Sequence, residues 1–271
     1  MSPRPVAYDL HVHTEFSPDS TTPLESYAQS ADEHSIHLGF CDHFELAFME
    51  RHDYLNHDRL GQLFERYDQV HSLYPQTSLS LEIDYYSDLA SEVAEFCDTY
   101  RKDLDYLIGV VHTVDRHAVT TPEEMAQLAS RLTLATILER YFHEVEAAIS
   151  SNLFDGLAHI DGVMRYVPLY PASSDLEAYW QERTLQLGLL CRKHGVLVEV
   201  NLRGLRHPWK RTHPAEHIIT ELAKEGVQFY VGSDSHCLRD FQDSIPLLIK
   251  THRILNEHVC FQLPPFRRST G

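Results

Sequence analysis

Hydrophobic and polar positions along the chain alternate between short apolar runs and longer amphipathic segments. Seven runs rich in β-branched, aromatic and leucine residues predict strands at residues 6–10, 38–42, 79–83, 105–111, 154–158, 196–200 and 228–232. Amphipathic segments near residues 23–36, 56–73, 88–101, 123–150, 175–194, 214–225 and 242–256 predict helices. This repeated strand–turn–helix order indicates an α/β protein whose parallel strands are joined by right-handed crossovers.

Residues at the helix boundaries support this division. The run TPLE at residues 22–25 predicts a capping box with proline at the first helical position. Gly195 and Gly226 stand where a helix should end before the next strand begins. No glycine-rich phosphate-binding turn follows the first strand, so seven such units favour a (β/α)7 barrel over a Rossmann sheet. Because no linker or change of composition interrupts the pattern, we expect residues 1–271 to form one domain.

Composition and charge narrow the class of protein. The 23 basic and 40 acidic residues give a net charge of −17, which disfavours nucleic acid and anionic membranes as partners. No apolar run approaches the roughly 20 residues that cross a bilayer, and the N-terminal residues lack the apolar core of a secretory signal. The five cysteines are scattered and form no CxxC pair, which is typical of free thiols in a reducing compartment. We therefore expect a cytoplasmic protein.

Polar side chains with metal-binding chemistry follow the predicted strands. His11 and His13 lie two residues apart in an extended run, so their imidazoles point to the same side, and Asp234 and His236 repeat this spacing after the last strand. In a parallel barrel the carboxyl ends of all strands meet on one face. The imidazoles and carboxylates expected there are His11, His13, Asp19, His43, Glu82, His112, His159, Asp234 and His236. Such ligands without thiolate suit zinc, manganese or iron in a hydrolytic site.

These motifs resemble a known family. DLHVHT, CDH, GVVHTVD, LAHID and VGSDSH, together with Glu82, are similar to the motifs of the polymerase and histidinol phosphatase (PHP) family, in the same order, from about residue 8 to residue 240. The resemblance implies a distorted (β/α)7 barrel that holds three divalent metal ions. Aspartate at position 19, the chain length and an arginine after LAHID make the chain most similar to members that hydrolyse L-histidinol phosphate in histidine biosynthesis.

The resemblance also implies how the metals are held. It divides the nine side chains into three ligand sets, the first two bridged by Glu82: His11, His13, Glu82 and Asp234; Glu82, His112 and His159; and Asp19, His43 and His236. Asp19 departs from family members with histidine at this position, which leaves the identity of the third metal open. Asp42, beside His43, is expected to orient a ligand rather than to bind metal itself.

The expected chemistry is hydrolysis of a small phosphate monoester. Two metals about 3.5–4 Å apart can share a hydroxide and stabilise both oxygens of an in-line displacement. We therefore expect a metal-bridging hydroxide to attack phosphorus with inversion and without a phosphoenzyme. Arg165 and Arg203, in the loops after the fifth and sixth strands, are the candidates for binding the phosphate oxygens.

The remaining candidate residues concern the leaving group and the rest of the substrate. Asp161 is expected to orient His159 or to protonate the leaving alkoxide, and His207 is a candidate at the mouth of the site. The substrate that the resemblance implies carries a cationic amine and an imidazole. The carboxylates that can meet these groups are Asp42, Glu45, Asp115 and Asp161, and the sequence does not rank them.

Two other functions fit the same motifs. One is a related phosphoesterase that acts on another small phosphate ester or on nucleic-acid ends, although the net charge of −17 disfavours nucleic acid. The other is a metal-binding barrel without catalytic activity. A degenerate barrel is expected to have lost ligands, whereas all nine ligand positions are filled here.

Overall fold

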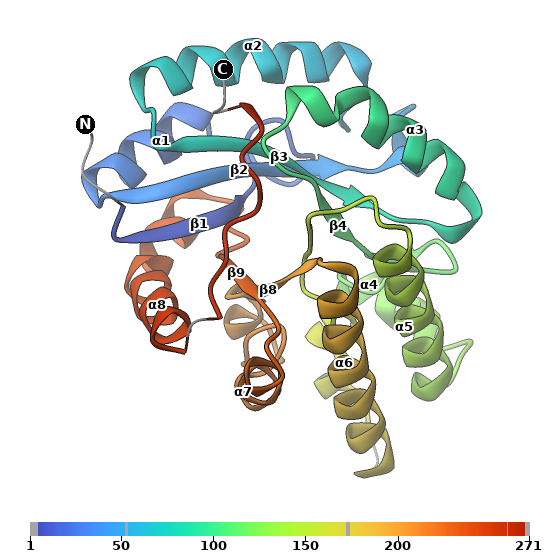
Figure 1. Cartoon of the computed structure of the whole chain (residues 1–271). Helices are drawn as coiled ribbons and strands as arrows, with labels where there is room; N and C mark the ends of the chain where they lie inside the picture. Colours follow the sequence, from blue (N-terminus) through green and yellow to red (C-terminus); the bar gives the residue numbers. More distant parts are fainter. Residues whose placement is uncertain (1–4, 52–53, 172–173, 259, 269–271) are drawn as a thin grey trace.

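Seven parallel strands form the centre of the molecule (Figure 1). The computed structural model describes residues 5–51, 54–171, 174–258 and 260–268. The strands, in their order across the sheet, are β1 (Ala7–Val12), β2 (Ile36–Phe44), β3 (Thr77–Asp84), β4 (Ile108–Val110), β7 (Gly156–Leu157), β8 (Leu197–Asn201) and β9 (Phe229–Gly232). Beyond β9 the chain returns to β1, where Val12 pairs with Ser235 and nearly closes a barrel.

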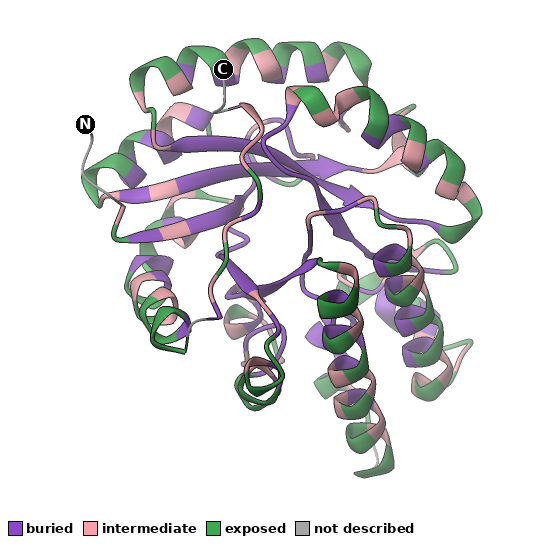
Figure 2. Ribbon diagram, in the orientation of Figure 1, coloured by how far each residue is buried: buried purple, intermediate pink, exposed green. Residues whose placement is uncertain are grey.

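Helices surround this sheet, and the strands are almost wholly buried beneath them (Figure 2). The α-helices are α1 (Leu24–Glu33), α2 (His57–Leu73), α3 (Ala90–Tyr100), α4 (Pro122–Ala129), α5 (Leu134–Ser150), α6 (Ser174–His194), α7 (Glu216–Lys224) and α8 (Leu238–Glu257). Within the described ranges, none of them combines the length and the apolar character that crossing a membrane requires.

All seven predicted strands are present, and the predicted (β/α)7 barrel is confirmed. The prediction of one helix over residues 123–150 is wrong, because the chain leaves the helix after Ala129 and starts a new one at Leu134. The Thr133 hydroxyl accepts a hydrogen bond from the backbone N–H of Thr136 (3.2 Å) and so caps the second helix. A two-stranded hairpin, β5 (Thr113–Val114) and β6 (His117–Ala118), was not predicted.

The two predicted glycine helix ends are confirmed, but the predicted capping box is not. Gly195 and Gly226 adopt positive φ angles of 70° and 77°, as predicted for residues that end α6 and α7. The predicted capping box at residues 22–25 is wrong, because Pro23 occupies the cap position of α1 and no side chain caps that end. Proline has an extended backbone here (φ −62°, ψ 146°), so the helix starts one residue later than the pattern indicates.

Apolar side chains fill the amino-terminal part of the barrel interior. A buried cluster that includes Leu10, Cys41, Tyr106, Ile108 and Tyr230 occupies this space. A C-terminal segment covers the same end: Phe261 pairs with Phe229 at the start of β9, and the backbone N–H of Arg268 donates to Asp105 (3.0 Å). The interior is therefore closed at the amino ends of the strands, and polar side chains are left to gather at the carboxyl ends.

Candidate metal centre and substrate cavity

The two histidines of β1 meet as their spacing predicts. Nε2 of His11 lies 3.0 Å from Nε2 of His13, and both residues are fully buried. Asp234, from the loop after β9, lies beside them, with its Oδ1 3.4 Å from Nε2 of His13. The backbone N–H of Asp234 donates to the carbonyl of His11 (2.8 Å), so the near-closure of the barrel also holds this group together.

Glu82 lies at the centre of the cluster. Its Oε1 is 3.1 Å from Nε2 of His159 and 3.6 Å from Nε2 of His112. Its Oε2 is 2.8 Å from Nδ1 of His43, and His43 is the register partner of Glu82 in the parallel pairing of β2 with β3. One carboxylate from β3 thus faces imidazoles from the ends of three other strands.

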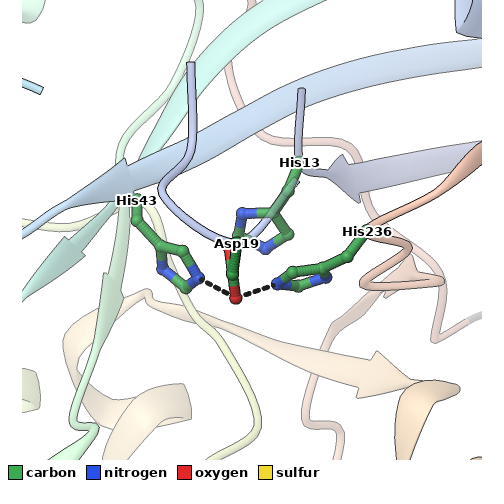
Figure 3. Close-up of side chains that lie close together, drawn as sticks. All are labelled: His13, Asp19, His43 and His236. Atoms are coloured by element: carbon green, nitrogen blue, oxygen red, sulfur yellow. Dashed lines mark ion pairs between the residues drawn. The ribbon is translucent and has the colours of Figure 1, made fainter. Parts of the chain in front are cut away.

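Asp19 joins a further group of imidazoles at the edge of the cluster (Figure 3). Its Oδ2 lies 2.9 Å from Nε2 of His236 and 3.6 Å from Nε2 of His43. His13 lies behind it, with ring centroids 4.0 Å from His236 and 4.2 Å from His43. The Asp19 side chain is 51% exposed, so this group is the one that opens to solvent.

All nine predicted ligands come together. In the described parts of the chain, four overlapping groups of side chains have ligand atoms within 4.8 Å of one another: His13, Asp19, His43 and His236; His11, His13 and Asp234; Glu82, His112 and His159; and His43, Glu45 and His112. The first three groups contain all nine predicted ligands, but they differ from the implied sets in two respects: His13 also joins the group of Asp19, and Glu82 joins only the group of His112 and His159. Glu45 was not predicted as a ligand, and its place two residues after His43 is the only signal that could have indicated it.

The donor atoms fit divalent cations. Glu82 Oε2 and His43 Nδ1 are buried and lie 2.8 Å apart, and among the described residues neither has a hydrogen-bond partner. Buried polar atoms without hydrogen-bond partners are rare in folded proteins and are typical of a site that binds an ion. The backbone of Asp234 has a φ of 52°, a left-handed conformation that is sparsely populated for residues other than glycine and is frequent at functional sites. The site is therefore built to bind divalent metal ions.

The charges of the cluster favour ionised carboxylates. Burial alone would raise the pKa of Glu82, but the imidazoles of His11 and His112 outweigh it and lower this pKa well below its usual range. Burial likewise opposes ionisation of Asp234, and Arg203 lowers the pKa of that carboxyl well below its usual range. Negative ligands are thus available at neutral pH.

A cavity of about 610 Å³ opens over the cluster. Asp19, Glu82 and His236 lie on its floor, and Glu45, Phe48 and Tyr54 lie among the other residues that line it. A neighbouring cavity of about 730 Å³ is larger, but its Arg116 and Arg140 are paired with Asp88 and Asp115. The smaller cavity is the candidate substrate site because it alone of the two contains the metal-binding residues.

Both predicted phosphate-binding arginines line this cavity. Arg165, in a 3-10 turn (Gly162–Arg165), is buried with Nη2 3.5 Å from Oδ2 of Asp234. Nη1 of Arg203 lies 2.7 Å from the carbonyl oxygen of Asp234. In the described ranges, the Nε atom of neither arginine has a hydrogen-bond partner, so each retains a donor. His207 also lines the cavity, and burial together with Arg165 and Arg203 lowers its pKa to about 3, which keeps its imidazole neutral.

Two predicted substrate contacts are placed elsewhere. Asp42 is fully buried and accepts hydrogen bonds from Thr14 (2.6 Å from its N–H, 2.7 Å from its hydroxyl) and from the hydroxyl of Ser17 (2.7 Å). Asp161 is fully buried and lies 2.8 Å from Nδ1 of His213. Neither residue lines the cavity, so contact with substrate is not supported for either. Asp42 instead holds the loop that carries Asp19, because both of its oxygens are used by that loop.

Two further carboxylates behind the cluster were missed. Glu199, in β8, accepts a hydrogen bond from Nδ1 of His11 (2.7 Å), and Asp84, at the end of β3, accepts one from the backbone N–H of His112 (3.0 Å). A signal was present for Glu199, since it is an acidic residue inside the otherwise apolar run VLVEV. An ionisable residue in a buried strand requires partners, and these partners turn out to be metal-binding residues.

Comparison with known proteins agrees with this geometry. The family model of the PHP domain matches residues 9–203. The chain belongs to the PHP domain family. A Deinococcus radiodurans protein named "Probable histidinol-phosphatase" is 26% identical over 235 residues, which cover 84% of this chain and 85% of that protein.

Solved structures share the PHP barrel. A Listeria monocytogenes protein aligns with a TM-score of 0.81 and 19% identity, covering 89% of this chain and 99% of that chain. The histidinol phosphate phosphatase of Lactococcus lactis, solved with zinc, L-histidinol and phosphate, aligns with a TM-score of 0.75 and 20% identity, covering 96% of each chain. These likenesses confirm the fold expected from the sequence motifs.

Proposed function

We propose that this PHP-domain protein is a metal-dependent phosphomonoesterase that hydrolyses L-histidinol phosphate to L-histidinol and phosphate in histidine biosynthesis. The observation that carries the proposal is the convergence of nine imidazole and carboxylate ligands with two arginines at one cavity. The name of the Deinococcus radiodurans relative and the ligands bound in the Lactococcus lactis structure support the choice of substrate. The five free cysteines are consistent with a cytoplasmic location.

Three divalent ions, zinc, manganese or iron, would be held by the three groups of ligands. His11, His13 and Asp234 would hold the first, and His112 and His159 the second, with Glu82 between them. Asp19, His43 and His236 would hold the third. Bound there, divalent ions would act as Lewis acids toward phosphoryl oxygens and would lower the pKa of water, the usual chemistry of hydrolytic metal centres.

Arg165 and Arg203 would bind the phosphate. Both guanidinium groups reach the cavity from loops at the carboxyl ends of neighbouring strands, and both have an unpaired Nε among the described residues. Arginine presents a planar fork of donors that matches two phosphate oxygens at once. The partial burial of Arg203 and the near-complete burial of Arg165 would keep these donors in place before the substrate enters.

Glu45 is best placed to meet the cationic amine of the substrate. Of the four carboxylates that the sequence left unranked, Asp42 and Asp161 are buried behind the cavity, and Asp115 is paired with Arg140 at the neighbouring cavity. Glu45 alone among the four lines the cavity. Phe48 and Tyr54 line the same wall, where an imidazole ring can pack against aromatic faces.

A substrate panel tests the proposal. The purified protein, loaded with each metal in turn, is given L-histidinol phosphate, p-nitrophenyl phosphate, several sugar phosphates and a labelled DNA single strand. We expect kcat/KM for L-histidinol phosphate to exceed that for the aryl phosphate by at least tenfold, and no release of nucleotides. Equal rates on the two esters would contradict the substrate assignment. Bound metal without turnover of any ester would indicate a metal-binding barrel without activity.

A further inference from the structure

Glu199 lies directly behind the metal-binding residues and touches none of the cavity. It is fully buried in β8, and its two oxygens receive three hydrogen bonds. Oε1 accepts from Nδ1 of His11 (2.7 Å), and Oε2 accepts from the backbone N–H of His159 (3.0 Å) and from Nδ2 of Asn201 (2.9 Å). The chain leaves room for this carboxylate at Gly232, where any Cβ would overlap Oε1.

The contact with His11 determines which ring nitrogen carries a proton. A carboxylate can only accept, so Nδ1 of His11 must be the donor. The other nitrogen, Nε2, faces the cluster, 3.0 Å from Nε2 of His13 and 3.5 Å from Oε1 of Glu82. A neutral imidazole protonated at Nδ1 has its lone pair at Nε2, the atom that a cation in the cluster would meet.

Asn201 connects Glu199 to a second proposed ligand, Asp234. Nδ2 of Asn201 donates both to Oε2 of Glu199 and to Oδ2 of Asp234 (3.1 Å). Because Oδ1 of Asn201 accepts from the backbone N–H of Arg203 (2.9 Å), the amide cannot turn over without losing this bond. Glu199 and Asn201 therefore contact the side chains of His11 and Asp234, from β1 and the end of β9, and the backbone of His159, after β7.

We propose that Glu199 is a positioning residue of the metal centre, which sets the tautomer of His11 and, through Asn201, the orientation of Asp234. The inference rests on the metal-dependent function proposed above but not on the choice of substrate. Carboxylates that orient a metal-binding histidine typically contribute a factor of about 10–100 to metal affinity or activity.

Glu199→Gln is the decisive variant because it keeps the size of the side chain. A glutamine offers one accepting oxygen and a donating NH2 group to a site with three donors, so at least one donor loses its partner. Asp105→Asn is the matched control, since Asp105 is also a buried carboxylate but lies at the amino end of the barrel, where it accepts from the backbone N–H groups of Leu79 and Arg268. Both variants should have a lower Tm than wild type.

The zinc affinity of the protein distinguishes Glu199→Gln from the control Asp105→Asn. The full-length proteins are stripped with a chelator and titrated with zinc against a competing indicator, and bound zinc is counted by elemental analysis. We expect Glu199→Gln to weaken zinc binding by about 10–100-fold and Asp105→Asn to leave it within twofold of wild type. Nitrogen-15 spectra of the zinc-loaded wild type should show His11, assigned by its absence in His11→Gln, protonated at Nδ1 and not at Nε2; in Glu199→Gln the signal of this Nδ1–H should shift, because its carboxylate acceptor is replaced by an amide.

Three results would overturn the inference. Zinc affinity of Glu199→Gln within twofold of wild type, with a Tm loss like that of Asp105→Asn, would make Glu199 merely structural. His11 protonated at Nε2 in the zinc-loaded wild type would exclude the tautomer argument. If Glu199→Gln does not fold, Asn201→Ala decides: weaker zinc binding supports the inference, and unchanged binding refutes it. A wild-type protein that binds no divalent ion would instead overturn the proposed function itself.

Discussion

Nη1 of Arg203 lies 2.6 Å from Nδ1 of His236. The same Nη1 donates to the carbonyl of Asp234 (2.7 Å), and Nδ1 of His236 lies 3.1 Å from that carbonyl. Arg203 therefore contacts the loop that supplies two of the proposed ligands while it also lines the cavity. This position is consistent with the proposed role of Arg203 in binding a phosphate oxygen.

Replacing Arg203 by alanine should lower kcat/KM for L-histidinol phosphate by about 10- to 1000-fold, or roughly 1.4–4 kcal/mol of transition-state stabilisation. Arg203→Lys should recover part of the loss, because lysine keeps the charge but not the fork of donors. Steady-state kinetics measure both effects. Arg239→Ala is the control, since Arg239 is 89% exposed on α8 and pairs only loosely with Asp243 (3.7 Å). If Arg203→Ala has full metal content and unchanged kinetics, Arg203 does not bind the phosphate of the substrate.

Removing the metals should abolish activity and destabilise the fold. Ligands that bind only the folded protein stabilise it by about 2.7–4.1 kcal/mol at 100 to 1000 times their Kd. For a chain of this size that corresponds to a fall in Tm of roughly 5–15 °C on chelation. Differential scanning calorimetry and phosphate release are measured before and after treatment, and zinc, manganese and iron(II) are then added back separately. Full activity in a protein shown to contain no metal would contradict a metal-dependent reaction.

The ends of the strands explain why so much of the site could be predicted. Parallel strands place their carboxyl ends on one face, so a residue such as His43 or His159 needs only its position at or just after the end of a strand to be assigned to the cluster. The i, i+2 spacing of His11 and His13 fixes their common direction in the same way. No knowledge of distances was required for these residues.

Other features depend on tertiary packing that no local pattern contains. Asp42 lies near the carboxyl end of β2, beside the predicted ligand His43, yet Thr14 and Ser17 donate hydrogen bonds to both of its oxygens, and it does not line the cavity. Glu199 contacts His11 from behind the predicted ligands, and this contact depends on the packing of β8 beside β9, which the local sequence does not reveal. The break before α5 depends on the local competition between a continuing helix and the Thr133 cap, which periodicity cannot decide.

Glu45→Gln should impair recognition of the amine but not the chemistry at phosphorus. A hydrogen bond to a charged group contributes about 1.5–3 kcal/mol, so kcat/KM for L-histidinol phosphate should fall by about 10–100-fold, mostly through KM. The rate on 3-(imidazol-4-yl)propyl phosphate, which is the same ester without the amine, should change by less than threefold. Because Glu45 also lies near His43 and His112, metal content is measured in parallel. An equal loss on both esters would indicate that Glu45 serves the metal centre instead.

His37 should make the fold sensitive to acid independently of the metal centre. It lies at the amino end of the barrel, where its Nε2 is 3.1 Å from the hydroxyl of Ser78 and its ring stacks on Phe266 (centroids 5.1 Å apart). Burial, with a smaller contribution from His71, lowers its pKa from 6.5 to about 4. Between these two values the unfolded chain binds more protons at this residue than the folded chain does.

Stability from neutral His37 is therefore complete above about pH 6.5 and is lost as the pH falls toward 4. Between pH 7 and pH 5 the cost is about 1–2 kcal/mol, so His37→Gln should lose less stability over this interval than wild type. Urea unfolding at both pH values measures the difference, in which the histidines of the metal centre cancel because both proteins contain them. His258→Gln, at an exposed position after α8, should behave like wild type. Parallel stability curves for wild type and His37→Gln would show that His37 does not carry the acid sensitivity.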